Sequence, residues 1–127
     1  RIRPALLLLA AKLFDYQGKL VGKILKTFPK PNGAKAQVLC SECTGSMKDK
    51  PLAGMVFFWN FTRDAENPNK WLDGKVLNPE DGKTYNAEAE LSDDGKTLAV
   101  FGYIRLLIKL GGTSKWQRPT AEELRGL

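Results

Sequence analysis

The 127-residue sequence contains no histidine, and this absence excludes several kinds of catalytic site. Hydrolases with a histidine base and metal centres with imidazole ligands both need a residue that the chain does not have. Catalysis would have to use carboxylates, lysine, tyrosine or the two cysteines alone. The composition therefore favours a protein that is not an enzyme and that carries no cofactor and no metal.

Long apolar runs are also missing. The run from Ala5 to Ala11 is short even for the core of a signal peptide, and a membrane-spanning helix needs about 20 apolar residues. We expect a soluble chain without a membrane span, in which residues 1–11 form an atypical N-terminal segment. The net charge of +6 comes from lysines and arginines scattered along the chain. Because they form no basic patch, we expect no nucleic-acid partner.

Glycine-containing turn signals divide the rest of the chain into short segments. "DYQGK", "EDGK" and "DDGK" (15–19, 80–83 and 93–96) suit tight hairpin turns, in which glycine adopts positive φ angles without steric cost. The segments between them are rich in β-branched and aromatic residues and are predicted to be strands. The predicted strands are 12–16, 20–26, 54–61, 70–77, 84–91, 97–109 and 113–118.

Two of these segments indicate which side chains share a face. In "TYNAEAEL" (84–91), apolar and polar residues alternate with the period of a half-buried strand. The same alternation in "GMVFFWNF" predicts one face with Met55, Phe57, Trp59 and Phe61, and the opposite face with Val56, Phe58 and Asn60. Gly74 falls inside the strand "WLDGKVL", which indicates a bulge or a close approach of two backbones.

Consecutive strands joined by tight turns predict an all-β protein, an antiparallel up-and-down meander closed into a barrel. We expect one domain over 1–127, with a long loop at 27–53 that crosses one mouth of the barrel. Pro119 and the capping-box spacing from Thr120 to Glu123 predict a short helical turn at the C-terminus.

Cys40 and Cys43 form a Cys-x-x-Cys pair within the long loop. A disulfide between them is geometrically possible and suits an oxidising compartment. A thioredoxin-type redox pair would open a helix after a strand, and no such pattern surrounds "CSEC". A zinc site needs about four ligands, which one chain with two cysteines and no histidine supplies only with carboxylates. We therefore predict a local disulfide between Cys40 and Cys43 that pins the loop, with redox-labile thiols and a metal site as the alternatives.

The aromatic residues are the candidate binding site. They are either plain core or the lining of a dry pocket, because a barrel of about eight strands has room for side chains or for one small ligand. Small residues on neighbouring strands, Ala87, Ala89, Ala99 and Gly102, would leave the volume for a ligand if they face inward. The predicted ligand-binding residues are Met55, Phe57, Trp59, Phe61, Trp71, Tyr85 and Tyr103.

Several motifs together resemble an uncharacterised family of small bacterial secreted or periplasmic proteins, a domain of unknown function. They are "GKLVGKI" (18–24), "KDKPLAGM" (48–55), the hairpin "WLDGKVLNPEDGKTY" (71–85), Gly102–Tyr103 and "KWQR" (115–118). The resemblance covers about residues 12 to 119 and implies a lipocalin-like β-barrel with no established activity. The family usually opens with a Gly-x-Trp strand, which "RIRPALLLLAA" lacks. A missing first strand would leave an open barrel edge, through which two copies could form a homodimer.

Composition, pattern and resemblance together predict an exported, non-enzymatic protein, secreted or periplasmic, that binds a small apolar ligand inside the barrel. One alternative is a structural or protein-interaction module of the cell envelope whose barrel interior is filled by side chains. Another is a thiol-redox protein that uses Cys40 and Cys43. The fold by itself does not assign a function, because one fold hosts many functions.

Overall fold

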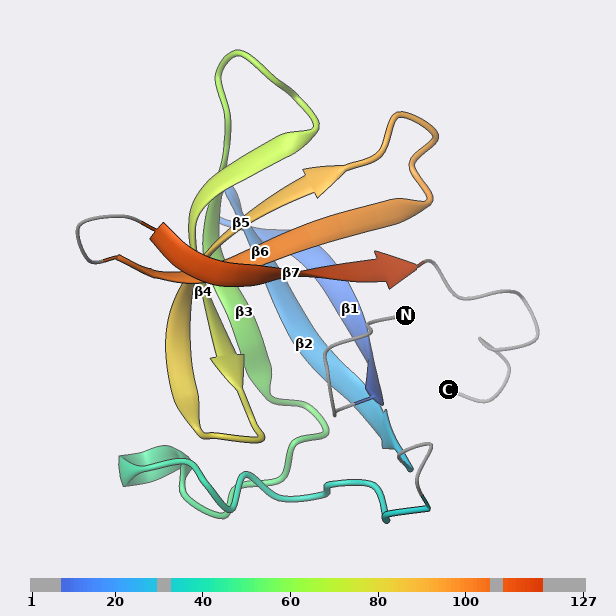
Figure 1. Ribbon diagram of the computed structural model, residues 1–127, viewed down its shortest axis with the longest axis vertical. Coiled ribbons are helices and arrows are strands. Elements are labelled where there is room, and N and C mark those ends of the chain that lie inside the picture. Colours follow the sequence, from blue (N-terminus) through green and yellow to red (C-terminus); the bar gives the residue numbers. More distant parts are fainter. Residues whose placement is uncertain (1–7, 30–32, 106–108, 118–127) are drawn as a thin grey trace.

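The computed structural model describes residues 8–29, 33–105 and 109–117. Seven strands form one antiparallel sheet in which each strand pairs with its neighbour in the sequence (Figure 1). A short 3-10 helix, η1 (Gly45–Met47), lies in the long connection between the second and third strands. The strands are β1 (Leu8–Tyr16), β2 (Lys19–Phe28), β3 (Val56–Arg63), β4 (Lys70–Asn78), β5 (Lys83–Leu91), β6 (Thr97–Arg105) and β7 (Lys109–Gln117).

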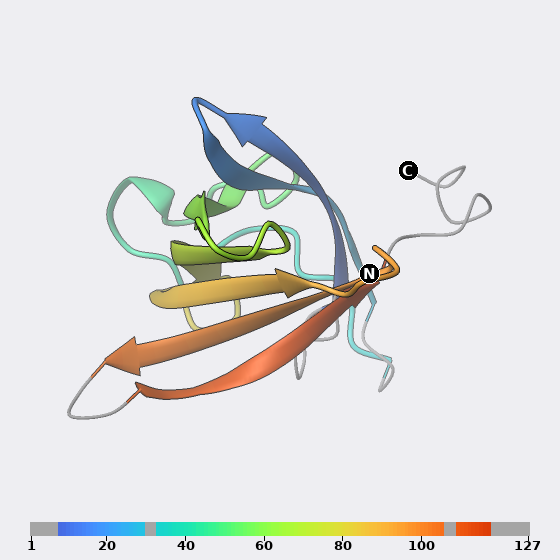
Figure 2. The ribbon, with the colours of Figure 1, turned by 90° about the horizontal axis from the view of Figure 1, so that it is seen from above.

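The sheet is a half-barrel, so the prediction of a closed barrel is only partly confirmed. It curls from β1 and β2 on one side to β6 and β7 on the other (Figure 2). Within the described residues, β1 pairs only with β2 and β7 only with β6, so the two edge strands are not joined by a ladder. Closure depends on strand number and on the stagger between strands, and the period of a single strand encodes neither of these.

The predicted strands correspond to the observed ones, with three differences. β1 begins at Leu8, four residues before the predicted strand 12–16, so residues 8–11 of the N-terminal segment belong to the sheet. The segment predicted as one strand over 97–109 is divided, because β6 ends at Arg105 and β7 begins at Lys109. The helical turn predicted after Pro119 lies outside the described residues.

The alternation predicted for β5 is confirmed, and the alternation predicted for β3 is wrong at one position. Ala87 and Ala89 on the dry face of β5 are buried. On β3, Phe58 was expected opposite Phe61, yet their rings stack with centroids 3.8 Å apart. Asn60 lies between them with a φ of 67°, and this left-handed residue brings the two rings to the same side.

The irregularity in β3 is matched by one in β4. Asp73 has a φ of 60°, and its backbone carbonyl accepts a hydrogen bond of 3.1 Å from Nδ2 of Asn60. The register between β3 and β4 continues on both sides of this pair, at Trp59 opposite Lys75 and at Thr62 opposite Leu72. Asn60 and Asp73, both of left-handed conformation and joined by this hydrogen bond, therefore interrupt the regular geometry of the two strands without shifting the register between β3 and β4.

A candidate pocket between the edges of the half-barrel

A pocket of about 210 Å³ lies between the two sides of the half-barrel. Its walls come from β1, β3, β4, β5, β6 and β7, and from the turn that follows β4. None of the lining residues carries a charged side chain. They are Leu9, Phe57, Val76, Leu77, Asn78, Pro79, Tyr85, Val100, Gly102, Gly112, Ser114 and Trp116.

Two glycines that face each other across β6 and β7 border this space. Gly102 pairs with Gly112 in the ladder. A Cβ added at Gly112 would meet no heavy atom within 4 Å, and one added at Gly102 would meet only ordinary contacts at 3.9 Å. Neither glycine has the positive φ that would require glycine for conformational reasons. The absence of side chains at Gly102 and Gly112 therefore leaves open space at this part of the pocket wall.

The small residues predicted to provide volume divide into three groups. Gly102 lines the pocket as expected. Ala87 and Ala89 are 0% and 2% exposed and belong to the packed core next to it. Ala99 is one residue out of phase with the core residues Leu98 and Val100, so it faces away from the pocket. The sequence pattern did not identify Gly112, because the prediction considered only the small residues of the two preceding strands.

Trp116 forms one wall of the pocket together with Phe57. The two rings stack with centroids 5.5 Å apart and an interplanar angle of 19°. The indole Nε1–H of Trp116 is buried and, within the described part of the chain, has no hydrogen-bond partner. A buried donor without an acceptor costs about 1–3 kcal/mol. Among the described lining residues, Trp116 is the one with a buried side-chain donor that lacks a partner.

The other polar side chains that line the pocket either make a hydrogen bond or, in the case of Ser114, can rotate to make one. Tyr85 presents its ring to the pocket and donates a hydrogen bond from its hydroxyl to a carboxylate oxygen of Asp81. This hydrogen bond, with a smaller contribution from burial, raises the pKa of Tyr85 above its ordinary value of 10.0. The Oδ1 atom of Asn78 accepts a 3.0 Å hydrogen bond from the backbone N–H of Glu80. The hydroxyl of Ser114 can rotate to suit its surroundings.

Of the seven predicted ligand-binding residues, Phe57 and Tyr85 line the pocket. Met55 is buried where the long loop leads into β3, beside a second, more open hollow of about 340 Å³ that it borders with Met47 and Pro51. Phe61 stacks on Phe58 in the core. These residues therefore support the pocket from the core or lie beside it.

The remaining three predicted residues lie elsewhere. Trp59 is half-buried against the core, and Trp71 lies under the guanidinium of Arg63, 5.2 Å from the ring centroid. Tyr103 stacks on Phe101 with centroids 5.4 Å apart. Tyr103 and Phe101 are out of phase with the lining residues Val100 and Gly102, so they occupy the other face of β6.

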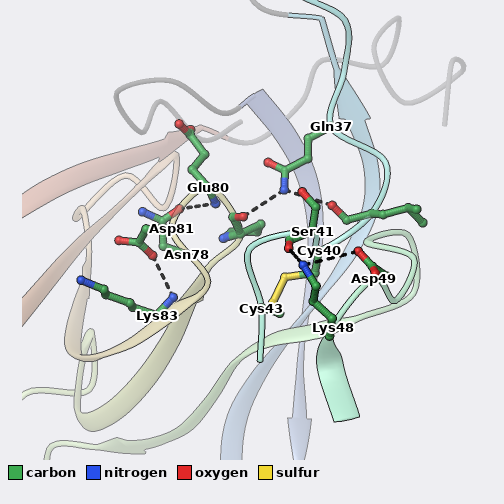
Figure 3. The surroundings of a disulfide bond; sticks show 12 residues. Gln37, Cys40, Ser41, Cys43, Lys48, Asp49, Asn78, Glu80, Asp81 and Lys83 are labelled. Atoms are coloured by element: carbon green, nitrogen blue, oxygen red, sulfur yellow. Dashed lines mark hydrogen bonds and ion pairs between the residues drawn. A yellow bond between two sulfur atoms is a disulfide. The ribbon is translucent and has the colours of Figure 1, made fainter. Parts of the chain in front are cut away.

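The cysteine pair forms a disulfide, and this disulfide fixes the long loop at the end of the sheet next to the pocket. Cys40 and Cys43 are 0% and 3% exposed, with Cα atoms 5.3 Å apart. The carbonyl of Cys40 accepts hydrogen bonds from the backbone N–H groups of Cys43, at 3.1 Å, and Asp49, at 3.0 Å. Figure 3 shows the pair beside the turn that carries Asn78 and Glu80.

Two contacts connect this loop with the turn between β4 and β5. Nε2 of Gln37 donates a 2.9 Å hydrogen bond to the carbonyl of Pro79, which itself lines the pocket. Gly82 lies so close to Glu42 that an added Cβ would be 1.9 Å from the Glu42 carbonyl oxygen. The loop thus lies at one end of the half-barrel, and its contact with Pro79 is a contact with the pocket wall.

The fold is lipocalin-like. The solved structure described as "Protein HP1028 from the human pathogen Helicobacter pylori belongs to the lipocalin family" matches with a TM-score of 0.73. The match covers 91% of this chain and 75% of that chain, at 21% sequence identity. The half-barrel therefore has a lipocalin-like fold.

A sequence profile of the bacterial family described as "Uncharacterized protein conserved in bacteria (DUF2147)" matches residues 10–118. The chain belongs to this family, as its motifs indicated. A search of curated proteins gave no significant match.

Two further observations concern the described residues only. They contain no group of three or more Cys, Asp or Glu side chains placed to hold a metal ion. None of the helices among them is long and apolar enough to cross a membrane.

Proposed function

We propose that the protein binds a small, largely apolar molecule in the pocket between the two sides of the half-barrel, and that it does so without catalysing a reaction. The observation that supports this most directly is the facing pair Gly102 and Gly112, which leaves uncharged, apolar space beside Phe57 and Trp116. Ligand pockets are concave, mostly apolar and provided with a few polar groups, and this one has that composition.

The volume limits the size of the ligand. An engineered cavity of about 150 Å³ binds benzene, whereas drug-sized ligands occupy about 300–1,000 Å³. At about 210 Å³, the pocket suits one ring with a short substituent, or the end of a longer molecule that extends into solvent. Gly112 is exposed, so the pocket opens to solvent on the β7 side.

Calorimetric titration with a single-ring hydrocarbon, α-methylstyrene, tests the proposal. We expect saturable binding with one site per chain and a negative heat-capacity change, the signature of buried apolar surface. Native mass spectrometry of protein purified from its own host, with a co-purified apolar molecule as the expected result, is an independent test. No binding of α-methylstyrene, together with no co-purified molecule, would support the alternative of an envelope module whose interior is filled by side chains.

We also propose that the protein works in an oxidising compartment, as an exported protein does. Disulfides persist in such compartments and are rare in the cytosol, and a disulfide joins Cys40 and Cys43. Fractionation of the host cells, with detection of the protein by antibody, tests this proposal. Recovery of the protein in the cytosolic fraction would contradict it.

A homodimer through the open sheet edge stays a prediction. β1 and β7 have unpaired edges within the described residues, and such edges are templates for strand addition. Sedimentation velocity over a range of protein concentrations tests it, and a purely monomeric sample would contradict it.

A further inference from the structure

The buried indole N–H of Trp116 indicates that the ligand has a hydrogen-bond acceptor in addition to its apolar part. Burial removes a polar group from water, and proteins almost always compensate by a hydrogen bond. Trp116 is a pocket-lining residue, and its Nε1–H has no acceptor among the described residues. This donor therefore needs an acceptor that the described residues do not supply.

Among the described residues, Nε1–H of Trp116 is the lining side-chain donor that is both buried and without a partner. The hydroxyl of Tyr85 is engaged with Asp81, and Oδ1 of Asn78 accepts from the backbone of Glu80. Ser114 has a rotatable hydroxyl, which is both donor and acceptor, so it gains less from a particular ligand atom. The indole N–H is a donor only, and its direction is fixed by the ring.

The charge of the pocket decides which kind of acceptor fits. No lining side chain is charged, so nothing in the wall would compensate a carboxylate that leaves water. Burial of an unpaired charge is far more costly than burial of a neutral oxygen. A carbonyl, ester or ether oxygen therefore suits the site, and a carboxylate does not.

We infer that the ligand is a neutral molecule with an apolar ring or short chain and one hydrogen-bond-accepting oxygen, which binds Nε1–H of Trp116. This inference rests on the proposed function. Binding of the oxygen requires the indole to turn toward the adjacent space of about 210 Å³, because Nε1 is closed off in the unliganded protein. Phe57, stacked on the same indole, then contacts the apolar part of the ligand.

Two probes of matched shape test the inference. Acetophenone and α-methylstyrene differ only in a C=O group in place of C=CH₂. We expect Trp116→Phe to weaken acetophenone binding about two- to tenfold, the equivalent of one hydrogen bond, and to leave α-methylstyrene within about twofold. An unchanged ratio of the two affinities in the variant would overturn the inference and leave the proposed function standing. Failure of both probes to bind the wild-type protein would overturn the proposed function itself.

A second measurement uses the wild-type protein and does not depend on the folding of a variant. The indole proton resonance of Trp116 is expected to move downfield when acetophenone binds, and not when α-methylstyrene binds. Trp59 and Trp71 do not line the pocket and provide internal references in the same spectrum. Equal movement of the Trp116 resonance with both probes would contradict a hydrogen bond.

Benzoate tests the charge of the ligand. It has the ring and the acceptor of acetophenone, but it carries a negative charge into an uncharged pocket. We expect binding at least about tenfold weaker than that of acetophenone, because the carboxylate loses its hydration without gaining a cation. Benzoate binding as tight as that of acetophenone would overturn the assignment of a neutral ligand.

Discussion

Gly74 of β4 lies directly against the ring of Phe61 of β3. A Cβ added at Gly74 would be 2.3 Å from Cε2 of Phe61, closer than any real contact of this type. The ring is fully buried and stacks on Phe58, so it has no free side toward which to move. The absence of a side chain at position 74 is therefore a packing requirement of the core.

Gly74→Ala is expected to destabilise the protein by about 1–3 kcal/mol, the usual cost of overpacking a core. Urea denaturation followed by tryptophan fluorescence measures the change. Gly102→Ala is the matched control, because its added methyl group meets its nearest atoms at 3.9 Å. That control is expected to be neutral or stabilising, since glycine within a strand is about 0.5–1 kcal/mol less favourable than alanine. Equal stability of the two variants would contradict the close approach at Gly74.

Gly112→Val is expected to fill the pocket and to weaken α-methylstyrene binding at least about tenfold without loss of stability. Its Cβ enters empty space, and its β-branched side chain suits a strand. Calorimetry measures the affinity, and urea denaturation measures the free energy of unfolding. Thr113→Val is the control on the same strand, because Thr113 lies on the opposite face and outside the pocket. Undiminished binding by Gly112→Val would exclude the glycine pair as the source of ligand space.

The pair Tyr85 and Asp81 is expected to contribute stability below about pH 10 and to lose it as the pH rises further. The hydrogen bond raises the pKa of Tyr85 above 10.0, so the neutral phenol is favoured in the folded protein. Above that pH, the unfolded chain releases the proton first, and the free energy of unfolding falls until the folded form also ionises. Absorbance at 295 nm during alkaline titration follows the ionisation.

Asp81→Asn is the variant that tests this assignment. Without the carboxylate as acceptor, the pKa of Tyr85 is expected to fall toward its ordinary value. Asp93→Asn, in the turn between β5 and β6, serves as a control of equal charge change. The same shift in both variants would indicate a general effect of net charge and contradict the specific hydrogen bond.

Replacement of both cysteines by alanine is expected to lower the free energy of unfolding by about 2 kcal/mol or less, because the disulfide closes a very short loop. The local effect is expected to be larger. Amide hydrogen exchange is predicted to accelerate at Cys43 and Asp49, whose N–H groups are hydrogen-bonded to the carbonyl of Cys40. Wild-type protein treated with dithiothreitol is expected to show the same exchange rates as the variant, and the variant is the control for that treatment. Unaltered exchange in the variant would show that the loop is ordered without the disulfide.

The positions of the strands could be predicted because they depend on local chemistry. Turn residues such as Gly18 and Gly95, both at positive φ, mark where each hairpin reverses. The glycine in the middle of β4 likewise indicated a bulge, and the register between β4 and β5 shifts between Trp71 and Gly74. These features are set by the residues themselves and by their immediate neighbours.

The composition of the pocket could be predicted only in part, because it depends on contacts between distant strands. The left-handed conformation of Asn60 places Phe58 with Phe61 and breaks the alternation on which the predicted binding face was based. Trp116 of the last strand, β7, stacks on Phe57 of β3. The residue pattern within either strand does not indicate that the two strands face each other. The open barrel was missed for a similar reason, since closure is a property of the whole sheet.

The open half-barrel also has a consequence for the folding rate. Every ladder joins strands that are consecutive in the sequence. The ladder that would close the ring, between β1 and β7, would have the highest sequence separation of all, and it is absent among the described residues. Folding rates fall as contact order rises, because the entropy of loop closure is lost before distant contacts form. This sheet is therefore expected to assemble hairpin by hairpin, and to fold faster than a closed lipocalin barrel of the same length.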